Sequence, residues 1–351
     1  MAPAVRQSIR RFSINELLVN DGWIEPCRCL GIFRKAWLCR SGEISSGPVV
    51  TLQPPGTNIV QIDGRGDRMH NQSWLLFGGP YGNLQATEAL LTEARSLGIP
   101  AERTLCTGDL VAYCGDPVET IDLIRDAGIP VVMGNCDEQL AAGADDCGCG
   151  FDPESSCARL SAGWYAYSNS VVRADQREWL ATLPKRIDLE IGQRSLAAIH
   201  GSARAINEFI FAGTPVSAKQ DSLDALGCDG VVGGHCGLPF TEQVGNRLWH
   251  NPGVIGMPAN DGTTRVWFSL VTPTENGVWI DHRALGYDHE AAQAAMRRAG
   301  LPPCYREALV TGLWPSLDVL PQGERAMTGF AIPQTRFAWP AGKISPLFNA
   351  A

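Results

Sequence analysis

Four short apolar runs, each followed by glycine and a polar side chain, constrain the fold of this 351-residue chain most strongly. "RTLCTGDL" delivers Asp109, "IPVVMGNCDE" delivers Asn135, "SLAAIHGS" delivers His200 and "DGVVGGHCG" delivers His235. Short apolar runs that end at glycine are typical of buried strands in an α/β sheet. Because ligands gather at the carboxyl ends of such strands, we expect these four side chains to meet at one site.

Five sequence blocks follow one another in an order that resembles a known enzyme family. They are "GDLVAYCGDP", "GNCDE", "HGSARAINEF", "GHCGLPF" and "NPGVIGMP", within residues 73–271. The order resembles the GD, GNCD, HGSPRD, GHTH and NPGSVG blocks of the small prokaryotic branch of the calcineurin-like metallophosphoesterases. One block would be a weak signal, whereas five in order are specific. The resemblance implies an α/β fold of two mixed β-sheets packed face to face with flanking helices, a four-layer α/β/β/α sandwich.

The resemblance also assigns metal ligands. Asp109 matches the aspartate that bridges the two metals of the family, and Asn135, His200 and His235 match the remaining protein ligands of the second metal. One carboxylate, one amide oxygen and two imidazoles suit a divalent transition metal (Mn, Fe, Zn or Ni) better than Ca or Mg. The alternative is that these residues are retained for structure, with His235 a satisfied core histidine.

Three family positions carry other residues in this chain. Gly79 stands where the family has the aspartate of its first block, and Tyr81 and Gly237 stand where it has histidines. All three family residues bind only the first metal. Since one ligand set is lost and the other kept, we predict one metal ion in the second-metal site.

Three further side chains are candidates for catalysis. Arg204 occupies the arginine position of the HGSPRD block, where a free guanidinium would bind a phosphate or carboxylate, and a surface salt bridge is the alternative. Cys136 stands where related phosphatases often carry a histidine thought to protonate the leaving group, and a thiol near a cation could become a thiolate. Tyr81 could donate a hydrogen bond where a second cation would lie, or its ring could simply fill the space.

The predicted single metal bears on the substrate. One ion can polarise a phosphoryl oxygen but cannot clamp both the attacking and the leaving oxygen. Monoester hydrolysis requires accelerations of up to about 10²¹-fold, so a phosphodiester or an activated ester is the easier substrate. We therefore expect a metal-dependent hydrolase that acts on a small, phosphorylated molecule. The alternative is a non-catalytic or regulatory relative that binds a metal or a phosphorylated ligand.

Composition excludes several other classes of protein. With 44% apolar and 19% charged residues, the chain reads as soluble and globular. Its net charge of −8 argues against nucleic acid as a partner. No apolar run approaches the roughly 20 residues of a membrane span, and the first 30 residues lack a signal-peptide pattern. We expect a cytoplasmic protein; the sequence does not indicate its oligomeric state.

The chain is also rich in cysteine. In a reducing compartment its twelve cysteines are expected to be free thiols or metal ligands. Cys147, Cys149 and Cys157 cluster in "DCGCGFDPESSC" and could hold a separate zinc or iron ion. The alternative is a cysteine-rich loop that packs near the cleft.

We predict three parts along the chain. Residues 1–72 form an N-terminal extension of irregular structure or short strands, because glycine and proline interrupt them repeatedly. Residues 73–286 form the metallophosphoesterase-like domain. Its helix over 115–128 should begin with Asp116 as a side-chain cap and Pro117 in the first turn. Residues 287–351 form a C-terminal helical appendage, or a lid over the cleft, and a tail.

Overall fold

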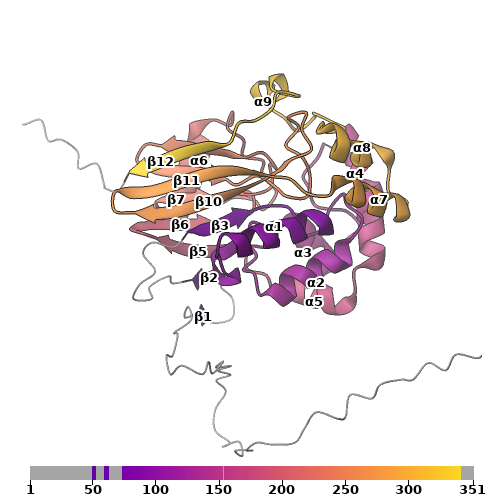
Figure 1. Ribbon diagram of the computed structural model, residues 1–351, viewed down its shortest axis with the longest axis horizontal. Coiled ribbons are helices and arrows are strands. Elements are labelled where there is room, and N and C mark those ends of the chain that lie inside the picture. The colour runs from indigo at the N-terminus through magenta and orange to yellow at the C-terminus, as the bar shows by residue number, and fades with distance from the viewer. Residues whose placement is uncertain (1–49, 53–58, 63–72, 153, 341–351) are drawn as a thin grey trace, which may run out of the picture. The chain divides into compact units, whose positions relative to one another are not determined.

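The computed structural model describes residues 50–52, 59–62, 73–152 and 154–340 (Figure 1). Most of the predicted N-terminal extension and the last part of the predicted tail lie outside these residues. Within the extension, the described strands β1 (Val50–Leu52) and β2 (Ile59–Ile62) pair in antiparallel fashion, and β2 continues in parallel to β5 (Arg186–Ile191).

The described strands form two mixed sheets. The first has the order β1-β2-β5-β6-β7-β9-β8. Its remaining strands are β6 (Arg194–Ala198), β7 (Gly230–Val232), β8 (Phe240–Val244) and β9 (Arg247–Asn251). Since β6 and β7 run in parallel as neighbours, the residues that follow them emerge at the same edge of the sheet.

The second sheet has the order β12-β11-β10-β3-β4. Its strands are β3 (Trp74–Phe77), β4 (Thr104–Cys106), β10 (Val266–Thr274), β11 (Gly277–Leu285) and β12 (Thr335–Pro340). β3 and β4 are parallel, whereas β10 pairs with β3 and with β11 in antiparallel fashion. The loop that follows β4 therefore lies beside the loop that follows β3.

The two sheets pack face to face, as predicted. Successive side chains of a strand point to opposite faces, and β3 shows the consequence. Trp74 and Leu76 join a buried cluster with Ile187 and Leu196 of the first sheet, whereas Leu75 and Phe77 join the cluster under the helices. A fully apolar strand is thus buried on both faces.

Helices cover the outer faces of both sheets, which completes the predicted α/β/β/α sandwich (Figure 1). α6 (Val216–Leu226) packs on the first sheet through Leu223. The helices packed on the second sheet are α1 (Leu84–Ser96), α2 (Pro117–Ala127), α3 (Asn135–Ala142), α4 (Ser156–Val171), α5 (Ala174–Leu180), α7 (His289–Arg298) and α8 (Pro303–Thr311). The 3₁₀ turn η1 (Ala101–Arg103) and the short helix α9 (Gln322–Ala326) complete the described helices. None of the helices in the described ranges is long and apolar enough to cross a bilayer.

The start of α2 differs from the prediction in one respect. Pro117 opens the helix as expected, and Asp116 stands at the cap position. However, the Asp116 side chain makes no capping bond and instead accepts a hydrogen bond from Gln85 Nε2 at 3.0 Å. Asp116 therefore connects α1 to α2, and the carboxylate is used between helices rather than within one.

Candidate metal centre

Asp109 lies in the loop that follows β4, in a backbone conformation that few residues adopt. Its φ is 58°, and that of Gly108 before it is 99°. A Cβ on Gly108 would lie 2.7 Å from the Gly134 nitrogen, so only glycine fits this approach of two loops. Positive φ at a non-glycine residue costs free energy and concentrates at functional sites. The loop thus holds the Asp109 carboxylate at a fixed point at the end of the sheet.

Asn135 is the first residue of α3, directly after Gly134. The predicted strand before it is reduced to a single parallel bridge between Val131 and Cys106, but the chain still emerges beside β4. A Cβ on Gly134 would come within 2.3 Å of Asp109 Oδ1. Glycine at this position therefore allows the carboxylate to reach the start of the helix.

His200 follows β6 and His235 follows β7, so the parallel pairing of these strands brings the two imidazoles together. His235 has a φ of 57°, which is the same unusual conformation as that of Asp109. A Cβ on Gly234 would lie 2.7 Å from Thr107 Oγ1 and 3.1 Å from His200 Nδ1. Gly134 and Gly234 thus make room for the side chains of Asp109 and His200.

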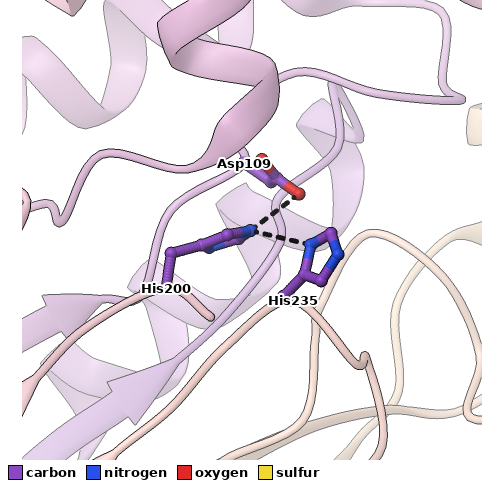
Figure 2. A group of neighbouring side chains, drawn as sticks. All are labelled: Asp109, His200 and His235. Carbon is purple, nitrogen blue, oxygen red and sulfur yellow. Dashed lines mark hydrogen bonds and ion pairs between the residues drawn. The ribbon is translucent and has the colours of Figure 1, made fainter. Parts of the chain in front are cut away.

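Four side chains converge on one point, as Figure 2 shows for three of them. His200 Nε2 lies 3.2 Å from Asp109 Oδ2, 3.1 Å from Asn135 Oδ1 and 3.2 Å from His235 Nδ1. All four residues are at least nine-tenths buried. Within the part of the chain that the structure describes, Asp109, His200 and His235 are the group of His, Cys, Asp or Glu side chains that could hold a metal ion.

The hydrogen bonds around this point indicate that its atoms present lone pairs. His200 Nδ1 donates to the Thr107 carbonyl at 2.6 Å, which leaves Nε2 without a proton in the neutral ring. Asn135 Nδ2 donates to the Cys147 carbonyl at 2.8 Å, so its oxygen faces His200. An ion about 2.1 Å from two neighbouring ligands separates them by about 3 Å, close to the distances found here. The donor set therefore fits a divalent cation.

Electrostatics favour a positive charge at the same point. Burial opposes ionisation of Asp109, but the adjacent His200 and His235 lower the pKa of its carboxyl group below the ordinary value. Burial likewise opposes the charged form of His200, yet Asp109 raises the pKa of its imidazole. Burial and the neighbouring His200 lower the pKa of His235 to about 3, so that ring stays neutral. Ionised Asp109 and neutral His235 are thus in the states that metal binding requires, whereas His200, whose raised pKa reflects the charge of Asp109, would release its proton when a cation binds.

Asp137 is a positioning residue that the list of candidates omitted. It is fully buried, and its carboxylate accepts backbone hydrogen bonds from Asp109 at 2.8 Å, Leu110 at 3.0 Å and Gly134 at 2.9 Å. These bonds join the two loops that carry Asp109 and Asn135. Its place in "GNCDE", two residues after Asn135 at the end of an apolar run, is the sequence feature that could have identified it.

Three residues stand where the family has its first-metal ligands, and they lie on one side of the donor group: Gly79, Tyr81 and Gly237. Tyr81 is buried, with a φ of 54°, and its ring lies against Gly79, where an added Cβ would be 2.4 Å from the phenol Cζ. Gly237 faces the indole of Trp314. Burial and then the charge of Asp109 raise the pKa of the Tyr81 phenol well above its ordinary value, so it remains a neutral donor.

Arg204 is not brought into this group. Its guanidinium is exposed and pairs with Glu208 at 2.6 Å, so the expectation of a free guanidinium beside the metal is not met. The surface salt bridge, the alternative in the sequence analysis, is the arrangement found. Cys136 does touch Asp109: its backbone nitrogen donates to Oδ1 at 3.0 Å, and its thiol also lies against that carboxylate and accepts a hydrogen bond from Asn135 Nδ2 at 3.5 Å. Burial, followed by the charge of Asp109, raises the pKa of its thiol well above the ordinary value.

The predicted three-cysteine metal site is wrong for this state of the protein. Cys147 and Cys149 are joined in a disulfide, so neither offers a thiolate, and the expectation of free thiols fails for this pair. Cys157 is a free, buried thiol at the start of α4. The packing alternative describes the loop better, because the Cys147 carbonyl orients the Asn135 amide.

A cavity opens beside Asp109 and His235. Its walls come from the strand-end loops, from the cysteine-rich loop and from the segment that includes and follows α8. Six aromatic side chains contribute to the lining: Tyr81, Tyr113, Phe151, Phe209, Tyr305 and Trp314. The donor group thus lies at the end of an apolar recess, which is the usual form of a small-molecule site.

Comparisons with known proteins agree with this fold. The sequence profile of the calcineurin-like phosphoesterase superfamily domain matches residues 81–273. The uncharacterized protein MJ0912 of Methanocaldococcus jannaschii is 25% identical over 249 residues, which cover 66% of this chain and 95% of that protein.

Two solved structures share the architecture. A metallophosphoesterase from Sphaerobacter thermophilus aligns with a TM-score of 0.55 at 23% identity, over 69% of this chain and 100% of that one. A hypothetical protein from Pyrococcus horikoshii aligns with a TM-score of 0.57 at 19% identity, over 69% and 99% of the two chains. Since the family profile spans more than half of its residues, the chain belongs to the calcineurin-like phosphoesterase superfamily.

Proposed function

We propose that this protein is a metal-dependent phosphoester hydrolase that uses a single divalent transition metal held by Asp109, Asn135, His200 and His235. The observation that carries the proposal is the set of lone-pair atoms within 3.2 Å of His200 Nε2. The family is divalent metal-dependent. A bound cation supplies Lewis acidity and lowers the pKa of water. The residues of the chain hold the cation and contact the substrate.

The surroundings of the site favour a substrate of low charge. Among the described residues that line the cavity there is no lysine or arginine, and Arg204 is paired with Glu208. A divalent ion beside the Asp109 carboxylate leaves about one positive charge, which balances a phosphodiester monoanion better than a monoester dianion. We therefore propose a small phosphodiester or an activated ester as the substrate class.

Tyr81 has a separate role in this proposal. Its neutral phenol lies where the family resemblance places a histidine ligand, and it lines the same cavity as Asp109. A buried hydroxyl in this position can donate a hydrogen bond to a phosphoryl oxygen and stabilise the charge that develops there. Tyr81 would thus supply part of the stabilisation that a second cation gives.

The proposal is tested with protein loaded separately with Mn, Fe, Zn or Ni. We expect hydrolysis of bis-p-nitrophenyl phosphate that a chelator abolishes and that His200→Ala lowers by at least about 100-fold. Glu208→Gln, which changes only the exposed ion pair with Arg204, is the matched control. Absence of turnover with all four metals contradicts the proposal.

A non-catalytic relative is the second candidate, and it rests on Gly79, Tyr81 and Gly237. If these residues mark a lost activity, the protein binds a metal or a phosphorylated ligand without turnover. Metal-dependent binding of a phosphodiester in the absence of hydrolysis would favour this candidate.

A further inference from the structure

The cavity beside the donor group has a composition that the proposed chemistry does not require. Hydrolysis of a phosphodiester needs the metal ligands and access for water, but not six aromatic side chains. Their arrangement is ordered. Tyr113 meets Tyr81 edge-on at 4.9 Å between ring centroids and lies 4.7 Å from Tyr305 in a tilted contact.

A second aromatic wall faces the cavity from the other loops. Phe209 packs on His235 at 4.1 Å and stacks with Phe151 at 6.2 Å. The wall therefore begins at a metal-ligating imidazole and continues away from it. Asp109 and His235 line the same cavity as these rings, so a ligand held beside them lies next to the aromatic wall.

The third wall comes from outside the residues that match the family profile. Tyr305 belongs to α8, and Trp314 and Val319 follow it, whereas the matched region ends at residue 273. The donor group thus comes from the part shared with the family, and this side of the cavity comes from the C-terminal segment.

Hydrogen bonds hold that third wall in place. The Trp314 indole N–H donates to the Pro258 carbonyl at 2.7 Å, and the Trp314 backbone N–H donates to Asn260 Oδ1 at 2.9 Å. Asp318 accepts hydrogen bonds from the backbone and hydroxyl of Ser156 at the start of α4, at 2.9 and 2.5 Å. A wall that is fixed before binding costs little further ordering when a ligand enters.

We infer that this cavity is a subsite for an aromatic ester group of the phosphoester, with Trp314 as its specificity-determining residue. The inference rests on the proposed function, because the ester group is placed relative to a phosphorus at the metal. Flat rings gain edge and face contacts with aromatic walls that an alkyl group cannot make. The subsite therefore selects aryl esters over alkyl esters of the same charge.

The test measures binding rather than turnover. Isothermal titration calorimetry of the Mn-loaded protein compares methyl phenylphosphonate with methyl methylphosphonate, two monoanions that carry a phenyl and a methyl group, respectively, on the same phosphorus. We expect the phenyl compound to bind at least about tenfold more tightly. Trp314→Ala should reduce this preference to less than about threefold and leave the affinity for the methyl compound unchanged.

Two further variants keep the test decisive if Trp314→Ala fails to fold. Val319→Phe places a ring in the cavity, so it should weaken the binding of the phenyl compound and leave that of the methyl compound unchanged. Trp279→Ala changes an exposed tryptophan of β11 and should preserve the preference. Equal affinity for the two compounds in the parent, or a preference that survives Val319→Phe, overturns the inference.

The binding result is independent of the proposed hydrolysis. A protein that prefers the phenyl compound but hydrolyses no ester supports the subsite and contradicts the hydrolase. A protein that hydrolyses bis-p-nitrophenyl phosphate but binds both compounds equally contradicts the subsite alone.

Discussion

The ring of Tyr81 occupies the space that a side chain at Gly79 would need. An ideal Cβ on Gly79 would lie 2.4 Å from Cζ, 2.6 Å from Cε1 and 2.8 Å from Cε2 of the phenol. No Cβ atom tolerates such contacts, so an aspartate at position 79 and the present position of Tyr81 exclude each other. Glycine at position 79 and tyrosine at position 81, the two departures from the family pattern, are therefore sterically coupled.

This coupling predicts how substitutions at the two positions combine. Gly79→Asp should destabilise the protein by about 1–3 kcal/mol through overpacking, in addition to the cost of its positive φ. In the Tyr81→His background the overpacking should be largely relieved. A double-mutant cycle from denaturant unfolding measures the difference.

Gly98 provides the matched control for that cycle. Its φ is +67° and no atom lies within 4 Å of an added Cβ, so Gly98→Asp reports the backbone cost without a clash. If Gly79→Asp costs no more than Gly98→Asp, or if its cost is the same in both Tyr81 backgrounds, the two residues are not coupled.

Removal of the Tyr81 hydroxyl tests its proposed function separately from its packing. Tyr81→Phe keeps the ring over Gly79 and should leave the free energy of unfolding nearly unchanged. It should lower kcat for bis-p-nitrophenyl phosphate by at least about tenfold, because a donor to the charged phosphoryl oxygens is lost. Tyr167→Phe, whose hydroxyl bonds to the Gly115 carbonyl, is a control of the same chemistry. An unchanged kcat in Tyr81→Phe would contradict the proposed donor role and mean that the Tyr81 ring only fills the space beside Gly79.

Two buried histidines outside the site predict how stability depends on pH. His282 and His250 both contact Thr241 Oγ1, at 2.8 and 2.9 Å. Burial lowers the pKa of His282 to about 4 and that of His250 well below its ordinary value. At these two histidines the unfolded chain therefore binds protons below about pH 6.5 that the folded chain does not, so their contribution to stability falls as the pH falls from about 6.5 to about 4.

Substitution of His282 isolates its share of this dependence. Its depressed pKa corresponds to at most about 3 kcal/mol across that range. His282→Gln should flatten the decline by an amount of this order, measured by denaturant unfolding of the metal-free protein at several pH values. His289→Gln, at the start of α7, serves as the control. A decline equally steep in His282→Gln and the parent would refute the assignment to His282.

The resemblance to the family implied the fold, and the pattern of apolar runs predicted that Asp109, Asn135, His200 and His235 meet. Apolar runs that end at glycine fix where strands stop, and parallel neighbours then bring the next residues together. The strand before Asn135 was overestimated, since only Val131 bridges to Cys106, yet the path of the chain is the same. The site was predictable because it depends on where strands end rather than on how long they are.

Other features depend on side-chain directions, which sequence patterns leave open. The exclusion between Tyr81 and Gly79 follows from the orientation of one ring. Arg204 turns to Glu208 instead of to the site, although the spacing of four residues already offered that partner. The bond between Cys147 and Cys149 was missed because the cysteines were expected to be free thiols or metal ligands.

The metal content of the purified protein tests the central proposal most directly. The protein is saturated with Mn, desalted and assayed for metal per chain, and anomalous scattering from its crystals locates the ion. We predict one ion per chain between Asp109, Asn135, His200 and His235, and none in His235→Ala. Two ions about 3.5 to 4 Å apart in the parent, the spacing of a two-metal centre, would contradict the single-metal site.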